Sequence, residues 1–196
     1  TAIGTASATD ADGDTLTYSI SGSEISIDSA TGVMSFVAAP DYETKPSYSA
    51  TVTASDGENS STQEITITIV NLNDNEPIFE SSSTFSANEN QTAIGTASAT
   101  DADGDTLTYS ISGSEISIDS ATGVMSFVAA PDYETKTAYE ATLTVSDSSF
   151  SSTENISITI NDLNDNNPEF ISSSTFSVPE EEIFIGTIQA TDADAN

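Results

Sequence analysis

The sequence predicts an all-β protein built from tandem seven-stranded β-sandwiches of Greek-key topology, and three observations lead to this prediction. Residues 1–45 are identical to residues 92–136, so a unit of 91 residues repeats along the chain. Apolar and polar residues alternate in short runs, which is typical of half-buried strands. No run has the apolar spacing of an amphipathic helix. A period of 91 residues is the length of a small domain, so the chain is expected to be a row of domains.

Six strands are expected in the first repeat, and Gly4 is expected to form a bulge in the first of them. Residues 28–32 are expected to form a turn, because Asp, Ser and Gly favour turns. A seventh strand is expected around Phe85, at the start of the second repeat. Seven strands in about 91 residues fit a Greek-key sandwich. The six expected strands are residues 2–9, 15–21, 25–27, 33–37, 48–55 and 64–70.

The charge balance excludes several classes of function. The chain has 32 acidic and two basic residues, Lys45 and Lys136, which gives a formal net charge of -30. This argues against a nucleic-acid partner and against docking on anionic lipid, since both need a basic face. High net charge is compatible with disorder. The apolar residues, 36% of the chain and alternating with a period of two, favour a folded protein whose charge keeps it soluble.

Missing residue types narrow the chemistry further. The chain has no Cys and no His, so it has no disulfide and lacks the commonest general base. No apolar run is long enough to cross a membrane as a helix, so no membrane insertion is expected in this segment. Paired acids occur in glycoside hydrolases. Here every pair recurs at the end of an expected strand and no lined cleft is indicated, so no enzyme is expected.

Two stretches are interpreted as junctions between domains. Residues 71–79 and 162–170 are rich in Asn and Asp and contain Pro, a composition typical of turns. The predicted domains are residues 1–73, 74–164 and 165–196. Thr1 corresponds to Thr92, so the first domain lacks its leading strand, and the third stops as its second strand begins. Either the ends were set arbitrarily within a longer polymer, or a neighbouring copy donates the missing strand.

Acidic motifs recur at the expected strand ends of each repeat, at Glu89, Asp101 with Asp103, Asp132 with Glu134, and Asp147. Alternate residues of an extended chain share a face, so each pair can hold one cation. Carboxylate and amide oxygens are the ligands that Ca²⁺ prefers. Ordinary turn chemistry is the alternative interpretation. An EF-hand loop starting at Asp10 is disfavoured, because its sixth and twelfth positions are Thr15 and Ser21 instead of Gly and Glu.

Together with the junctions, these motifs resemble a tandem array of cadherin domains over the whole chain. The resemblance is carried, in order and twice over, by the Asn-Asp-Asn-x-Pro junction, the Asp-x-Asp pair, the Asp-x-Glu pair, the lone Asp and the early Glu. The loop after Asp103 is short, so the backbone carbonyl expected there is assigned to Gly104 or Asp105. The chain has no Trp, so the resemblance gives no support to adhesion that depends on an N-terminal Trp.

The resemblance implies about three Ca²⁺ ions at each complete junction. The carboxylates from both domains would then nearly balance the charge of the ions. At the first junction it implies the ligands Asp41, Glu43, Leu72 through its carbonyl, Asn73, Asp74, Asn75, Asp101, Asp103 and Asp147. At the second it implies Glu89, Asp132, Glu134, Leu163, Asn164, Asp165, Asn166, Asp192 and Asp194, whereas Asp10, Asp12 and Asp56 would serve a preceding junction.

The expected function is that of an extracellular, cell-surface array, stiffened by calcium, in a surface filament, stalk or large adhesin. The near-identical repeats, the lack of Cys and the scarcity of Lys and Arg suggest a bacterial source. A fibre held together by strand exchange between copies is a more specific form. Expected partners are other copies of the chain and surface glycans. The alternatives are a polysaccharide- or protein-binding module of a large secreted protein, and an appendage of a secreted enzyme.

Overall fold

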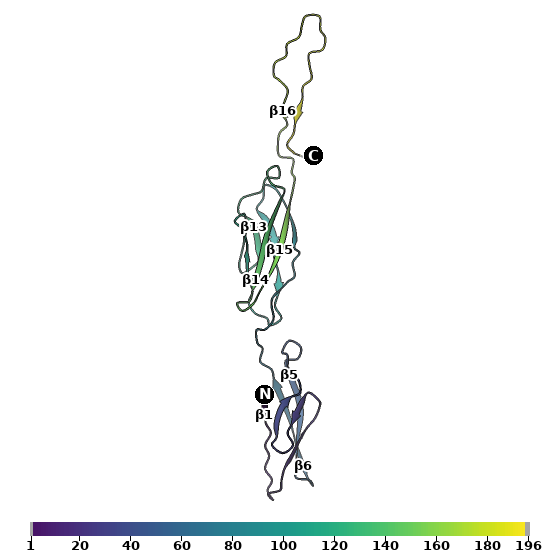
Figure 1. Cartoon of the computed structure of the whole chain (residues 1–196), viewed down its shortest axis with the longest axis vertical. Helices are drawn as coiled ribbons and strands as arrows, with labels where there is room; N and C mark the ends of the chain where they lie inside the picture. The colour runs from purple at the N-terminus through teal and green to yellow at the C-terminus, as the bar shows by residue number, and fades with distance from the viewer. Residues whose placement is uncertain (1, 195–196) are drawn as a thin grey trace. The chain divides into compact units, whose positions relative to one another are not determined.

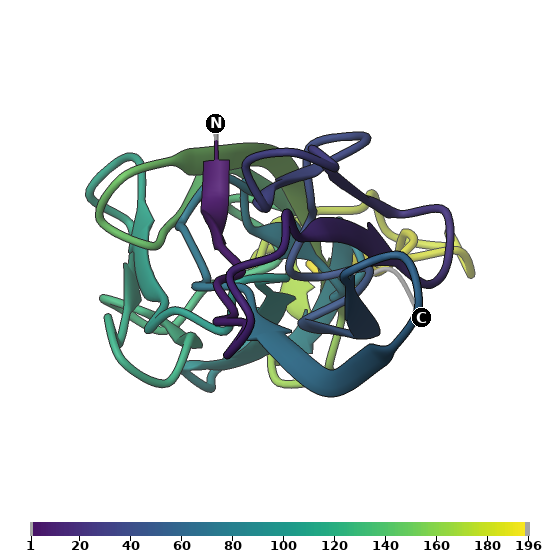
Figure 2. The same cartoon turned by 90° about the horizontal axis from the view of Figure 1, so that it is seen from below.

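The computed structural model describes residues 2–194, and all regular structure there is β-strand (Figures 1 and 2). The chain divides into two compact units, Thr1–Asp74 and Asn75–Asn196. The prediction of three domains, with boundaries after residues 73 and 164, stays a prediction. No helix in the described part of the chain could cross a membrane.

The second unit contains a complete sandwich of two sheets. One sheet has the order β12–β13–β9, and the other has the order β11–β14–β15–β8. The strands of the first sheet are β9 (Ala93–Thr96), β12 (Ile116–Ile118) and β13 (Val124–Phe127). Those of the second are β8 (Thr84–Asn88), β11 (Thr108–Ile111), β14 (Ala138–Ser146) and β15 (Ser151–Asn161).

The leading segment of this unit pairs with two different strands. Its first part, β7 (Ile78–Phe79), pairs antiparallel with β10 (Ala99–Thr100), which follows β9 along the chain. Its second part, β8, then runs parallel to β15, with Thr84 opposite Ser157 and Asn88 opposite Asn161. The leading segment therefore closes the side of the sandwich.

The core of the second unit follows from the period of two along its strands. In β15, the inward residues Ile156, Ile158 and Ile160 are each at most 2% exposed, while their neighbours in sequence face solvent. They pack with residues of β13 and β14, including Met125 and Leu143.

The first unit has two three-stranded sheets, ordered β1–β4–β3 and β2–β5–β6. A register shift between Ala2 and Gly4 fits the bulge expected at Gly4. The strands are β1 (Ala2–Thr5), β2 (Thr17–Ile20), β3 (Ile25–Ile27), β4 (Val33–Phe36), β5 (Ser47–Ser55) and β6 (Ser60–Thr68).

Five of the six expected strands differ from the structure in their bounds, and two of them differ by more than two residues at one end. The strand predicted at residues 64–70 is β6 and begins at Ser60, because the polar residues after the turn continue the ladder with β5. The strand predicted at residues 2–9 ends at Thr5. The identical sequence in the second unit forms β10 as well, because β7 is present there to pair with it.

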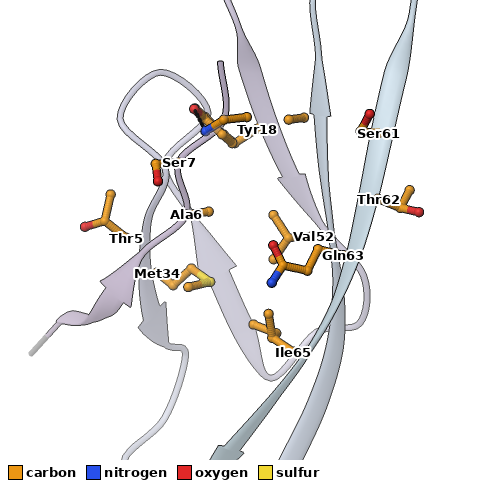
Figure 3. Close-up of a pocket in the computed structure, with 12 residues that line it drawn as sticks. Thr5, Ala6, Ser7, Tyr18, Met34, Val52, Ser61, Thr62, Gln63 and Ile65 are labelled. Atoms are coloured by element: carbon orange, nitrogen blue, oxygen red, sulfur yellow. Dashed lines mark hydrogen bonds between the residues drawn. The ribbon is translucent and has the colours of Figure 1, made fainter. Parts of the chain in front are cut away.

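No strand of the described residues in the first unit takes the place of β7 and β8. A groove therefore remains between its sheets, where Met34, Val52 and Ile65 line the open space (Figure 3). Met34 is 9% exposed, but its counterpart Met125 is 1% exposed.

After the sandwich, the chain continues as an extended excursion over residues 168–194, drawn in yellow in Figure 1. Its only regular pairing in the described residues joins β16 (Glu169–Phe170) to β17 (Ala190–Thr191). Apolar side chains between them are exposed, including Phe176 at 44% and Ile183 at 97%. Within residues 168–194, the apolar side chains form no buried cluster.

Candidate metal centres

Glu89 is the most deeply buried acid of the described residues, and it ties two loops together. It follows β8 and is 2% exposed. Its carboxylate accepts hydrogen bonds from the backbone N–H groups of Tyr133 and Leu163, both at 2.7 Å. These bonds offset part of the cost of burying the charge. Glu89 therefore fixes the loop of the Asp-x-Glu pair against the linker.

Four further acids gather around this point. Glu89, Glu134 and Asp165 have carboxylate oxygens within 4.8 Å of one another, and so do Glu134, Asp162 and Asp194. Glu134 belongs to both groups. Loss of hydration raises the pKa of Glu134, and the negative charges of Glu89 and Asp194 raise it further. The side-chain amide of Asn90 donates to Asp165 at the edge of the cluster.

The linker is locked to the Asp-x-Asp loop through Asn166. Its backbone N–H donates to Asp194 Oδ2 at 3.0 Å, and its side-chain amide donates to Asp194 Oδ1 at 2.9 Å. The side-chain bond from Asn166 is the main cause of the lowered pKa of Asp194. Asp192 accepts a bond from the backbone N–H of Asp194 at 3.1 Å. Both acids of this pair are therefore oriented before any ion binds.

The preceding Asp-x-Asp loop repeats this arrangement within the second unit. The backbone N–H of Asn75 donates to Asp103 Oδ2 at 2.8 Å, and the Asn75 side chain donates to Oδ1 at 3.2 Å. Asp101, Asp103 and Asp105 have oxygens within 4.8 Å of one another. Asp101 Oδ2 is buried and accepts no hydrogen bond from the described residues. An oxygen so placed is suited to a cation.

Asp147 lies at the same end of the sandwich as this loop. It follows β14, whose last residue, Ser146, pairs with Thr108, the first residue after the loop. Asp147 is 3% exposed, and its Oδ1 accepts bonds from the N–H groups of Ser149 and Phe150. The oxygen-only donor set at both ends of the second unit fits a hard cation such as Ca²⁺.

Other predicted ligands accept hydrogen bonds or line a pocket. Asp41 accepts a bond from the Thr44 hydroxyl at 2.7 Å, which lowers the pKa of Asp41, and Asp132 accepts the equivalent bond from Thr135 at 2.9 Å. In the first unit, a shallow pocket is lined by the three acids assigned to a preceding junction, Asp10, Asp12 and Asp56.

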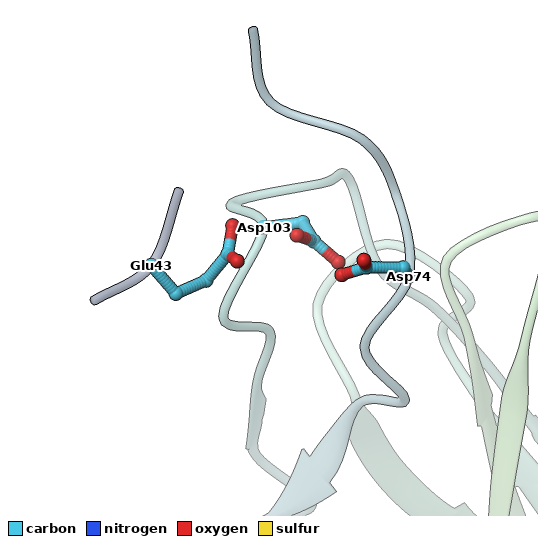
Figure 4. Close-up of side chains that lie close together, drawn as sticks. All are labelled: Glu43, Asp74 and Asp103. Atoms are coloured by element: carbon cyan, nitrogen blue, oxygen red, sulfur yellow. The ribbon is translucent and has the colours of Figure 1, made fainter. Parts of the chain in front are cut away.

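The predicted set for the first junction includes residues of both units. Glu43 and Asp74 belong to the first unit and Asp103 belongs to the second (Figure 4). Leu72 and Asn73 are also in the first unit. Asn164 lies on the second linker, next to Leu163, whose N–H binds Glu89. Their roles as ligands stay predictions.

The sequence interpretation did not include two acids, the side chain of Asp105 and Asp162. Both join groups of closely spaced carboxylates. Asp105 extends the Asp-x-Asp pair by one more alternate position, which is a signal that the sequence does contain. Asp162 has no such signal, because its counterpart in the first linker is Asn71.

Comparisons with known proteins agree with the sandwich fold. The family described as "Bacterial Ig domain" matches residues 73–161, and the family described as "Putative Ig domain" matches residues 2–70. Among curated proteins, human Cadherin EGF LAG seven-pass G-type receptor 2 is 33% identical over 218 aligned residues. That alignment covers 100% of this chain and 8% of the relative. Human Cadherin-23 is 32% identical, with 84% of this chain and 5% of the relative covered.

Solved structures show the same likeness. Protocadherin Gamma B2 extracellular cadherin domains 3–6 match with a TM-score of 0.81 at 25% identity, covering 96% of this chain and 53% of that chain. Mouse Cadherin-23 EC22–24 matches with a TM-score of 0.71 at 27% identity, covering 98% and 69%. The prediction of all-β, Ig-like sandwiches is confirmed. These named curated relatives are animal proteins, and the bacterial source stays a prediction.

Proposed function

Because the chain is a cadherin-like tandem array of Ig-type repeats, we propose that it is a calcium-stiffened segment of an extracellular structural or adhesive array. The expectation that the segment is not an enzyme is confirmed by this similarity to adhesion domains. The chain spans less than a tenth of the length of the curated relatives described above, so adhesion by the whole protein is part of the proposal.

The observation that carries the proposal is the acidic cluster around the buried Glu89. Its carboxylate oxygens lie within 4.8 Å of one another, so their negative charges repel when no cation is present. Only two side chains of the chain are basic, and both are engaged elsewhere: Lys45 pairs with Glu24 and Lys136 with Glu115, each at 2.6 Å. The cations that neutralise the cluster must therefore come from solution.

Calcium would supply this charge and bind oxygens from successive segments at once. At the second junction, Glu89 and Glu134 come from the body of the sandwich, Asp165 comes from the linker, and Asp192 and Asp194 come from the segment beyond it. An ion shared by all three parts opposes bending of the linker. We extend the proposal to the first junction by the same reasoning. We also include in it about three calcium ions at each junction. Extracellular calcium modules bind at roughly 10⁻⁴ to 10⁻³ M.

Thermal unfolding of a single variant tests this proposal. Glu134→Gln keeps the shape of the side chain but removes a charge that belongs to both acidic groups. We expect it to lower the Tm in calcium and to leave the Tm unchanged, or raise it, in chelator. Glu140→Gln, at an exposed position of β14, is the matched control and should behave as wild type. An equal loss of Tm in both solutions would rule out a metal role for this cluster.

The proposal also includes association between copies of the chain. It is supported by the adhesion domains among the relatives, such as the structure described as the protocadherin gammaB7 EC3–6 cis-dimer. The fibre held together by strand exchange is one form of such association. Surface glycans stay a predicted partner without further support.

A further inference from the structure

The inward side of β15 changes from polar to apolar halfway along the strand. Its inward residues are, in order, Ser152, Glu154, Ile156, Ile158 and Ile160, and of these the three isoleucines are buried. In β6, the matching strand of the first unit, Gln63 stands at the position of Glu154 and is also followed by inward isoleucines. A carboxylate of the second unit therefore faces the sandwich where an apolar residue would extend the core.

The leading segment of the second unit covers the two halves of β15 differently. Beside the isoleucines, β8 forms a parallel ladder with residues 157–161. The preceding residues, 78–82, turn to the other sheet: β7 pairs with β10, and the N–H groups of Glu80 and Ser81 donate to the carbonyl of Ser98 at 2.8 Å and 3.2 Å. We call residues 78–82 the latch. Beside it, the first half of β15 pairs only with β14 in the described part of the chain.

Two polar atoms are buried where the latch leaves the edge of β15. They are Oε2 of Glu154 and Oγ of Ser81, and neither forms a hydrogen bond within the residues that the structure describes. The parallel pair of Thr84 and Ser157, carried back three residues on each strand, places Ser81 beside Glu154. In the same region β7 contacts β15. Each atom loses its hydration without a bond in return, which destabilises the closed latch.

The contacts that hold the latch are weaker than those that hold β8. β7 pairs with β10 through Ile78 and Phe79, and Ile78 is 66% exposed while Phe79 packs against the core. β8 is joined to β15 along its whole length, and it buries Ala87 at 4% exposure. The side-chain amide of Asn161 also donates to Asn88 at the end of this ladder. Local stability follows buried apolar contact and hydrogen bonding, so the latch is the weaker part.

We propose that residues 78–82 open and close on the side of the folded second unit, and that the carboxylate of Glu154 keeps this latch ready to open. In the open state Glu154 and Ser81 regain water, while β8 stays paired with β15 and holds the two sheets together. The linker enters the unit at Pro77, directly before the latch, so tension along the chain reaches the latch before it reaches β8. The proposal goes beyond the function given above, and only the presence of tension rests on that function.

Thiol labelling of single cysteines tests the proposal, because the chain has no cysteine of its own. Ser81→Cys nearly keeps the size of the side chain and puts a thiol where the Ser81 oxygen is buried, so a reagent reaches it when the latch opens. Ala87→Cys puts a thiol under β8, at a position that is 4% exposed. We expect Ser81→Cys to react on the order of a hundredfold faster than Ala87→Cys under native conditions, since the two report openings of different free energy.

Glu154→Gln tests the role of the carboxylate. It introduces the residue that the first unit has at this position, Gln63. In the Ser81→Cys background it should slow labelling roughly tenfold, because the closed latch then buries an amide in place of a carboxylate. In the Ala87→Cys background it should leave the rate unchanged. Glu140→Gln, at an exposed position of β14, is the matched control and should alter neither rate.

Two results would overturn the proposal. Equal labelling rates at positions 81 and 87 would mean that the leading segment opens as one piece. A rate at position 81 that Glu154→Gln leaves unchanged or raises would remove the role of Glu154. Hydrogen exchange of the unmodified chain is an independent check, in which the amides of Glu80 and Ser81 should exchange faster than that of Ser157, which donates to Ser83.

The same order of rates is expected in calcium and in chelator, so a Tm that does not depend on calcium would leave the latch standing. Stretching the chain by its ends tests the response to tension. Labelling of Ser81→Cys should become faster with force, at forces that leave labelling of Ala87→Cys unchanged. A rate at position 81 that ignores force, or that rises only together with the rate at position 87, would overturn this part of the proposal.

Discussion

The first and second units share 45 identical residues and yet bury them differently. Ala6 is half-buried, but its counterpart Ala97 is 1% exposed, and Phe36 is half-buried where Phe127 is 3% exposed. The sequence between these positions cannot be the cause, because it is the same. The leading segment, β7 and β8, is present in one unit and absent from the described part of the other. Burial at the side of a sandwich is thus a property of the closing strand as much as of the residues themselves.

The largest effect that tests this comparison is expected from truncating one methionine in each unit. Met125→Ala should cost about 3 kcal/mol of unfolding free energy, in the range for a fully packed methionine. Met34→Ala, the same change in the same local sequence, should cost less, because Met34 borders the open groove. Denaturant unfolding of each variant, followed by hydrogen exchange within each unit, measures both. Equal losses would mean that the closing strand adds nothing to this contact.

Glu89 offers a second test, with a somewhat smaller expected effect. Glu89→Ala removes the acceptor for Tyr133 and Leu163, and hydrogen bonds to charged groups contribute about 1.5–3 kcal/mol. In chelator, the amides of Tyr133 and Leu163 should exchange much faster in the variant than in wild type. The amides of Tyr42 and Leu72 should already exchange fast in dilute wild type and should not change. Slow exchange of Tyr42 in the wild-type monomer would contradict the comparison.

A glycine pair gives a third, smaller test. Gly95→Val should destabilise the second unit by about 1–3 kcal/mol, because the new side chain meets the ring of Phe85 and because L residues rarely adopt the φ of 158° found at Gly95. Gly4→Val should leave the dilute first unit nearly unchanged, since the space beside it is open. Thermal unfolding at low protein concentration compares the two variants. A similar loss in both would show that contact with Phe85 does not control this position.

The smallest effect should be the same in both units, so it serves as an internal standard. A backbone bond from Thr31 is the main cause of the lowered pKa of Asp28, and the Thr122 hydroxyl is the main cause for Asp119. A lowered folded-state pKa gives stability that is present above the ordinary pKa and is lost as pH falls through the folded value. Asp28→Asn and Asp119→Asn should therefore lower the Tm by the same amount at neutral pH. In acid, neither variant should differ in Tm from wild type. A difference between the two would reveal an unequal turn.

Much of the fold was predictable because it depends on local pattern. The alternation of Ile65 and Ile67, and the turn residues around Gly32, indicate strands and a turn without reference to any distant segment. The start of β6 at Ser60 could not be predicted, because its first residues are polar and show no apolar alternation. Nor could β10, which forms only where β7 can pair with it.

Part of the candidate site could also be predicted from the sequence, and part could not. Spacing alone identifies Asp101 with Asp103 and Asp132 with Glu134, since alternate carboxylates share a face. The burial of Glu89 was not predictable, because it arises from two loops that are distant in sequence. Asp162 was missed because its counterpart in the first linker is Asn71, so the repeat gives no acidic signal there. Ligand assignments that rest on the resemblance stay predictions.

The two lysines lead to one further consequence. Each holds a glutamate while its ammonium group lies over a tyrosine ring, 4.4 Å from the centroid of Tyr48 or 4.0 Å from that of Tyr139. With both so engaged, the chain is a polyanion whose charge only dissolved ions can screen. Material made from it should swell in soft water and contract in brine, so that its mechanical properties follow the mineral content of its surroundings.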